Sequence, residues 1–124
     1  MEFFTVFFLG SLSYGLIEIL WRGWTHWTML ICGGLCFSLM YGISGLPIAK
    51  LKKYILSAAG IITVEFYAGC ILNIFLKMDI WDYSDLPFNI LGQICPEYFL
   101  LWLILSVPGI SFCRMLSGLF RRAQ

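Results

Sequence analysis

Four long apolar segments constrain the fold of this chain more than any other feature. They cover about residues 3–20, 27–48, 54–76 and 96–113, and each is long enough to cross the roughly 30 Å hydrocarbon core of a bilayer. Four segments are too few to close a β-barrel, and an open sheet edge would leave backbone groups unsatisfied in lipid. We therefore predict an all-α integral membrane bundle of four transmembrane helices, forming a single domain over residues 1–124.

Composition agrees with a membrane protein and excludes the soluble classes. Hydrophobic residues make up 60% of the chain and charged residues only 12%, whereas about a quarter of an ordinary soluble domain is charged. The net charge of +1 provides no basic face for nucleic acid, so we expect membrane lipids rather than nucleic acid as partners. The cysteine spacing and the single histidine do not form a zinc set, and we expect no metal and no cofactor.

The basic residues predict the orientation of the bundle. Most of them lie in the second loop or in the C-terminal tail, and the first and third loops hold only Arg22 and Lys77. Because positive charge accumulates on the cytoplasmic side, we expect both termini in the cytoplasm and the chain in the inner membrane of a bacterium. The residues that carry this bias are Lys50, Lys52, Lys53, Arg114, Arg121 and Arg122.

Two further patterns have structural explanations. Gly34, Ser38 and Gly42 repeat at a spacing of four, and such a stripe lets a neighbouring helix approach closely. That neighbour belongs either to the same chain or to a second copy, so a homodimer through this face is one expectation. The tryptophans fall near the expected outer membrane level, as interfacial belts require, and they are Trp21, Trp24, Trp27, Trp81 and Trp102.

Two acidic residues stand inside apolar segments, where ionisable groups are costly and usually mark function. Glu18 lies four residues before Arg22, which lies four before His26, so the three share one face of a continuing helix and a Glu18–Arg22 ion pair is expected. Glu65 falls near the middle of the third segment, and Asn73 follows on the same face. Glu65 is either a protonated group that hydrogen-bonds a neighbouring helix, or a proton carrier or ligand for a cation or headgroup.

The third loop, over residues 77–93, is too long for a tight turn and too apolar for a solvated one. Such a segment can fold back over the bundle or dip into it where it lines a polar cavity. We therefore predict a partly inserted outer loop and one outward-facing polar pocket beneath it. The candidate residues of this pocket are Glu18, Arg22, His26, Glu65, Asn73, Trp81, Asp82, Tyr83, Ser84, Asn89 and Gln93.

Three sequence runs resemble one family of small multipass membrane proteins. They are WDYSDLPFNILGQIC at 81–95, SLSYGLIEILWRG at 11–23 and VEFYAGCILN at 64–73, and they are similar to the Putative ABC-transporter type IV (CmpB-like) family. The resemblance covers most of the chain and implies a transport-related role. Gln93 stands where arginine is expected in many relatives, which removes a cation from that position. The family's shared polar positions map onto Glu18, Arg22, Glu65, Trp81, Asp82, Tyr83, Ser84, Pro87, Asn89 and Gly92.

Three functions fit these features. The first is a transport (permease-like) or ligand-binding component, which would need an external ATPase because the chain carries no glycine-rich Walker loop. The second is a membrane-embedded enzyme acting on a lipid or isoprenoid headgroup, with His26 or Glu65 as the general base and Arg22 holding a phosphate. The third is a non-catalytic lipid-binding or assembly protein whose polar groups lock the helices together.

Overall fold

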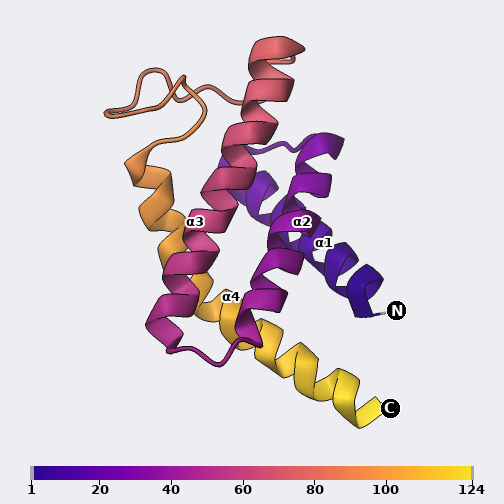
Figure 1. Ribbon diagram of the computed structural model, residues 1–124. Helices are drawn as coiled ribbons and strands as arrows, with labels where there is room; N and C mark the ends of the chain where they lie inside the picture. The colour runs from indigo at the N-terminus through magenta and orange to yellow at the C-terminus, as the bar shows by residue number, and fades with distance from the viewer. Residues whose placement is uncertain (1, 124) are drawn as a thin grey trace.

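The computed structural model describes residues 2–123, and four long helices account for most of them (Figure 1). A π-helix, η1, continues the third helix directly. All four helices are long and apolar enough to cross a membrane, so the predicted all-α membrane bundle is confirmed. The elements are α1 (Glu2–Arg22), α2 (Trp27–Ser44), α3 (Lys50–Gly69), η1 (Cys70–Phe75) and α4 (Pro96–Ala123).

Three helix ends differ by four residues or more from the predicted segment ends. One of them is the start of α3, which lies at Lys50 rather than near residue 54. α2 stops at Ser44 rather than near residue 48, because Gly45 caps the helix and Pro47 cannot continue it. α4 continues to Ala123 rather than ending near residue 113, since a helix does not have to end where hydrocarbon ends. α4 changes direction along its length in Figure 1, and Pro108 inside it removes a backbone hydrogen bond.

α1 and α2 pack closely through glycines. A Cβ atom added at Gly33 would overlap the Cβ of Tyr14, and one added at Gly10 would overlap the Cβ of Phe37. Gly34 of the predicted small-residue stripe also faces α1, against Phe7 and Ser11. Part of the stripe therefore serves a contact within the chain, and a homodimer through the rest of it stays a prediction.

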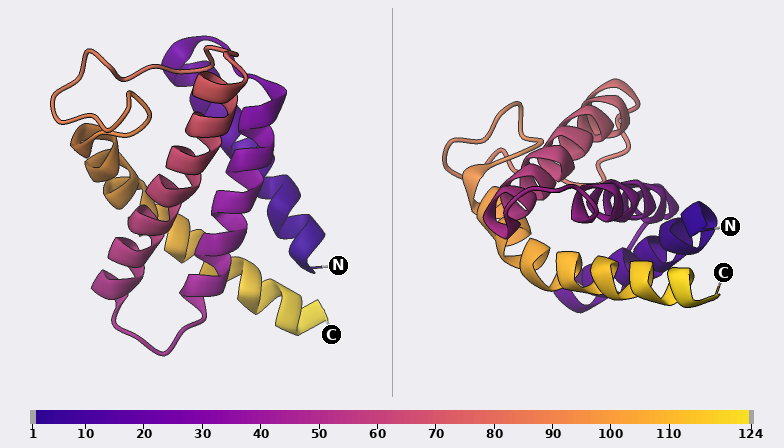
Figure 2. Two further views of the ribbon diagram at one scale, coloured as in Figure 1. Left: turned by 45° about the horizontal axis from the view of Figure 1, so that its top comes forward. Right: turned by 60° about the horizontal axis from the view of Figure 1, so that its bottom comes forward.

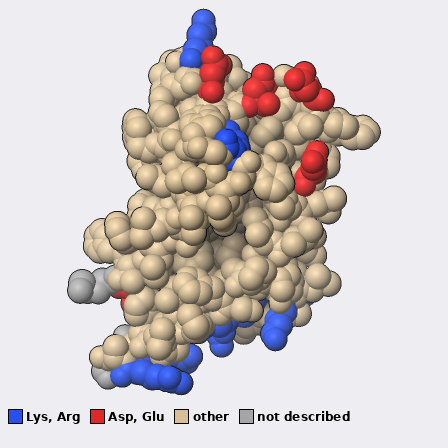
Figure 3. Space-filling view, turned by 180° about the vertical axis from the view of Figure 1, so that it is seen from behind, with Lys and Arg blue, Asp and Glu red and all other residues tan. Residues whose placement is uncertain are grey.

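Charged side chains gather at the two ends of the molecule. Figure 3 shows acidic groups at one end, most of the basic groups at the other, and few charges between them. The same face is hollowed near its centre. The α2–α3 connection and the C-terminus lie at one end of the bundle, and the loop between η1 and α4 lies at the other (Figures 1 and 2).

The loop between η1 and α4 folds back onto the helices, as predicted. Ile80 and Trp81 are buried and pack with Tyr14 and Met29 in one apolar cluster. Gly69 makes room for this contact, because a Cβ atom there would crowd the side chains of Gln93 and Trp81. The helix changes from α to π directly after Gly69, and π-turns often occur at functional sites.

Candidate functional site

Glu65 is a buried carboxyl group with one hydrogen-bond partner. The residue is only 6% exposed, and the indole Nε1 of Trp102 on α4 donates to its Oε1 at 3.0 Å. Its other oxygen, Oε2, is buried and has no hydrogen-bond partner among residues 2–123. An unsatisfied buried acceptor costs about 1–3 kcal/mol, and more when it is charged. The unpaired Oε2 atom is therefore the strongest indication that this site lacks a partner, which is either a ligand or a proton.

A cavity of about 210 Å³ lies beside this carboxyl group, and we call it the Glu65 cavity. Glu18 and Glu65 are its two acidic residues. Its walls come from α1, α3, α4 and the loop, so segments far apart in the sequence build it together. Most of the remaining lining is aromatic: Tyr14, Trp21, Tyr83, Tyr98 and Trp102.

Two stacked aromatic pairs fix the walls of the Glu65 cavity. Tyr14 of α1 stacks on Trp102 of α4, with ring centroids 5.7 Å apart and planes 17° apart. Tyr83 of the loop stacks on Tyr98 of α4 at 4.4 Å and 8°. Burial raises the pKa of Tyr83 well above its usual range, and the nearby Glu65 charge adds to this effect, so the phenol is neutral at physiological pH. The cavity is thus lined by aromatic side chains together with the two glutamates.

Glu18 differs from Glu65 because a cation compensates it. Its Oε2 lies 2.6 Å from the Nε of Arg22, which is the ion pair that the spacing predicts. Arg22 also donates to the carbonyl of Ile80 at 3.0 Å, and its guanidinium lies 4.5 Å from the ring centroid of Trp24. These contacts tie the end of α1 to the loop. They leave Glu65 as the uncompensated acidic group of the cavity.

Three of the predicted site residues hold the loop in place and are not among the residues that line the Glu65 cavity. Asn73 of η1 accepts the backbone N–H of Ile80 at 2.7 Å through Oδ1, and its amide donates to Oε1 of Gln93 at 2.8 Å. The indole of Trp81 donates to the carbonyl of Gln93 at 3.0 Å. Asn73, Trp81 and Gln93 therefore form one partly buried network that fixes the loop on the helix.

Three further predicted residues build the turn at the tip of the loop. The backbone N–H of Ser84 donates to Asp82 at 2.9 Å and lowers the pKa of that carboxyl below its ordinary value. Asn89 donates to the carbonyls of Ser84 and Leu86 and accepts the N–H of Gly92. These polar groups satisfy the local backbone and lie outside the lining of the Glu65 cavity.

His26 also lies apart from the cavity. It is the N-cap of α2, where its Nδ1 accepts the backbone N–H of Thr28 at 3.3 Å and contacts the hydroxyl of Thr28 at 2.7 Å. The residues of the predicted pocket that line the Glu65 cavity are therefore Glu18, Glu65 and Tyr83.

Four aromatic residues line this cavity but are not among the predicted pocket residues: Tyr14, Trp21, Tyr98 and Trp102. Trp102 was explained as an interfacial residue, but it donates to the buried Glu65. One signal was available for Tyr14, which lies four residues before Glu18 and thus on the same helix face. Nothing in the spacing relates Tyr98 or Trp102 to α1, because only the packing of α4 brings them there.

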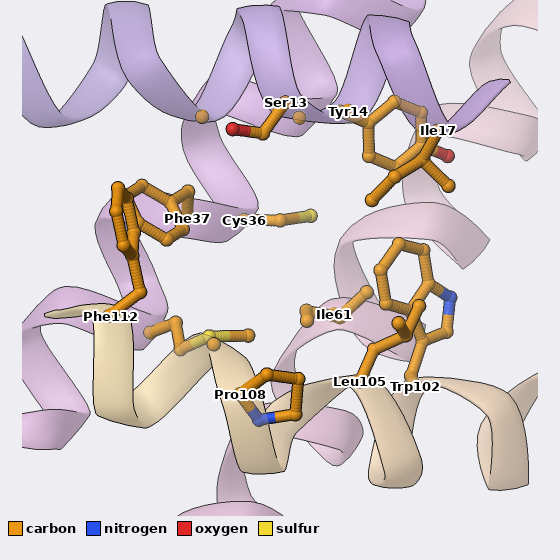
Figure 4. A pocket seen from close by; sticks show the side chains of 14 residues that line it. Ser13, Tyr14, Ile17, Cys36, Phe37, Ile61, Trp102, Leu105, Pro108 and Phe112 are labelled. Carbon is orange, nitrogen blue, oxygen red and sulfur yellow. The ribbon is translucent and has the colours of Figure 1, made fainter. Parts of the chain in front are cut away.

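A second cavity of about 240 Å³ adjoins the first, and we call it the apolar cavity. Figure 4 shows its side chains between α1 on one side and α4 on the other, with Phe37 and Cys36 from α2. Ser13 is the residue with a hydroxyl side chain in its lining besides Tyr14. The residues that line both cavities are Tyr14, Ile17, Trp102 and Leu105.

A family model described as Putative ABC-transporter type IV matches residues 3–122. The chain belongs to this family. No curated protein and no solved structure gives a significant match to the chain. Membership of the Putative ABC-transporter type IV family, together with four apolar helices, indicates an integral membrane protein related to transport. The resemblance found in the three sequence runs is thereby confirmed.

Proposed function

We propose that the chain is a permease-like, ligand-binding component of a membrane transport system and that it binds an organic ammonium ion in the Glu65 cavity. The observation that supports this most strongly is the Oε2 atom of Glu65, which is buried beside the cavity and has no hydrogen-bond partner within residues 2–123. An ammonium group would supply both a donor and a positive charge to this oxygen.

The lining of the cavity favours a cation over a neutral ligand. Aromatic rings attract cations through their negative faces, and aromatic cages are a common way to bind ammonium groups. Five aromatic side chains line the Glu65 cavity together with the two glutamates. Because Arg22 already compensates Glu18, one positive charge on the ligand would balance the one remaining carboxylate.

The structure favours the other two functions less. For the enzyme, one of the two expected bases, His26, caps α2, and the other, Glu65, does line the cavity. However, the expected phosphate ligand Arg22 is engaged by Glu18 and the carbonyl of Ile80. For the assembly protein, the Trp102–Glu65 hydrogen bond does join α4 to α3. However, a group whose only role is to join helices does not require an adjoining cavity or a free second oxygen.

The charge bias supports one orientation of the transport component. Because the α2–α3 connection and the C-terminus lie at the same end (Figure 2), one assignment places all six biased basic residues on the cytoplasmic side. We propose this orientation in a bacterial inner membrane, with the Glu65 cavity in the outer half and an external ATPase as the energy source.

Fusion proteins test the orientation. In a bacterial host, a C-terminal green fluorescent protein fusion should fluoresce and a C-terminal alkaline phosphatase fusion should be inactive. The reverse pattern contradicts the orientation.

Binding of butylammonium to the purified chain in lipid nanodiscs tests the proposed function. We expect wild-type protein to bind this probe and not to bind butyrate, which has the same chain and the opposite charge. Glu65→Gln should remove the charge partner at a cost of about 2–5 kcal/mol, which weakens binding by about thirtyfold or more. Isothermal titration calorimetry measures both effects.

Glu97→Gln is the matched control for this experiment. Glu97 is exposed in the first turn of α4 and is not among the residues that line the cavity, so this variant should bind butylammonium like the wild type. Equal binding of butylammonium and butyrate, or wild-type affinity in Glu65→Gln, would show that Glu65 does not bind a cation.

A further inference from the structure

We infer that the ligand is an amphiphile: its ammonium head lies in the Glu65 cavity, and a single hydrocarbon chain lies in the apolar cavity. This inference rests on the proposed function, since the Glu65 cavity supplies the site for the head. It adds the chemical class of the ligand and a route by which the ligand enters, from the lipid between α1 and α4.

The two cavities form parts of one site. Tyr14 and Ile17 of α1 and Trp102 and Leu105 of α4 line both of them, so a ligand can pass from one to the other along these four side chains. Their volumes are about 210 and 240 Å³, each below the roughly 300–1,000 Å³ of typical ligand sites. A ligand that occupies both would have a site within that range, whereas a ligand in either alone would not.

The chemistry of the lining changes from one cavity to the other. Both glutamates belong to the Glu65 cavity, and the described lining of the apolar cavity contains no charged residue. Phe37 and Phe112 lie at the end of the apolar cavity away from Tyr14 and Trp102 (Figure 4). An amphiphile therefore fits the two cavities in one orientation only, with its polar head at Glu65 and its apolar chain toward Phe112.

The seam between α1 and α4 faces the surroundings of the helix bundle. α1 packs mainly on α2, while α4 packs on α3 and α2, and α1 meets α4 at the Tyr14–Trp102 stack. Ile17 lines both cavities and is 43% exposed. In a membrane, exposure on this flank is exposure to lipid chains, so an amphiphile could enter sideways without leaving the bilayer.

The physical chemistry of lipid predicts what the chain contributes. Lipid tails are as apolar as the cavity wall, so moving a chain from the bilayer into the cavity gains little from the hydrophobic effect. The head group should therefore supply most of the affinity, and the chain should decide where the rest of the ligand lies. The experiment should therefore measure the position of the hydrocarbon chain rather than the binding affinity.

Photocrosslinking with alkylamines tests this inference. Dodecylamine with a diazirine at the chain end should label Phe37, Met40 or Phe112, and a probe with the diazirine beside the nitrogen should label Tyr83 or Tyr98.

Ser13→Trp places a large ring in the apolar cavity from an exposed position of α1. This variant should lose the chain-end labelling and still bind butylammonium, which shows that it is folded.

Leu12→Trp is the matched control, because Leu12 is the neighbouring residue, is 55% exposed and is not among the residues that line either cavity. It should keep both labelling patterns. Chain-end labelling confined to Leu12 and other outward residues of α1, with intact butylammonium binding, overturns the inference and leaves the proposed function standing. Loss of butylammonium binding in the wild type instead overturns the proposed function, and the inference with it.

Discussion

Gly33→Ala is expected to destabilise the bundle by about 1–3 kcal/mol, the usual cost of overpacking a well-packed core. The added Cβ atom would overlap the Cβ of Tyr14 and crowd its ring, so α1 must move away from α2. Tyr14 also stacks on Trp102 and lines the Glu65 cavity. The same variant should therefore weaken butylammonium binding. Thermal unfolding in detergent measures the first effect and calorimetry the second.

Gly42→Ala provides the comparison on the same helix. No side chain or backbone atom outside the helix lies within 4 Å of a Cβ atom added at Gly42. Alanine stabilises a helix interior by roughly 0.5–1 kcal/mol relative to glycine, so this variant should be as stable as the wild type or more so. If Gly33→Ala and Gly42→Ala unfold at the same temperature, α1 does not approach α2 through Gly33.

Asn73→Ala is expected to release the loop from the helix end. It leaves the buried N–H of Ile80 without its acceptor and the amide of Gln93 without its donor. At about 1–3 kcal/mol for each of the two unsatisfied groups, the loop should open more easily by about 2–6 kcal/mol. Hydrogen–deuterium exchange at Ile80 and Trp81 should then be faster. Because Tyr83 lies in the same loop and lines the Glu65 cavity, butylammonium should bind more weakly.

Thr63→Ala is the control for the loop. Thr63 lies on α3, and its hydroxyl donates to the carbonyl of Ala59 within the same helix, at an exposed position. Its removal leaves no buried partner unsatisfied, so exchange at Ile80 should stay at the wild-type rate. Wild-type exchange in Asn73→Ala as well would mean that the amide network does not hold the loop.

The sequence predicted the architecture well because membrane crossing is a strong local constraint. The lengths of the apolar segments predicted four helices. The end of α2 was predicted near residue 48 but lies at Ser44, although Gly45 and Pro47 are local signals of that end. The Glu18–Arg22 pair was also predictable, because both residues lie on one helix four positions apart. Each of these predictions depends on a few neighbouring residues.

The site was less predictable because its residues come together only through tertiary packing. The polar loop residues suggested a pocket, but Asn73, Asp82 and Asn89 form hydrogen bonds that hold the loop itself. An irregular loop has many backbone N–H and C=O groups without partners in regular secondary structure, and nearby polar side chains form hydrogen bonds with them. Trp21 and Trp102 were missed because membrane tryptophans have an ordinary interfacial explanation. Tyr98 was missed because nothing in its spacing relates it to the other residues of the cavity.

In the proposed function, the buried carboxyl group of Glu65 binds the ammonium group of the ligand. Solid-state NMR can measure the dipolar coupling between ¹⁵N-butylammonium and protein labelled with ¹³C at the glutamate carboxyl carbons. We predict a measurable coupling, because a charge-assisted hydrogen bond holds nitrogen and oxygen about 2.7–2.9 Å apart and the labelled carbon is bonded to that oxygen. This coupling should persist in Glu18→Gln. Bound butylammonium without this coupling, or a coupling that disappears in Glu18→Gln while the ligand stays bound, would contradict it.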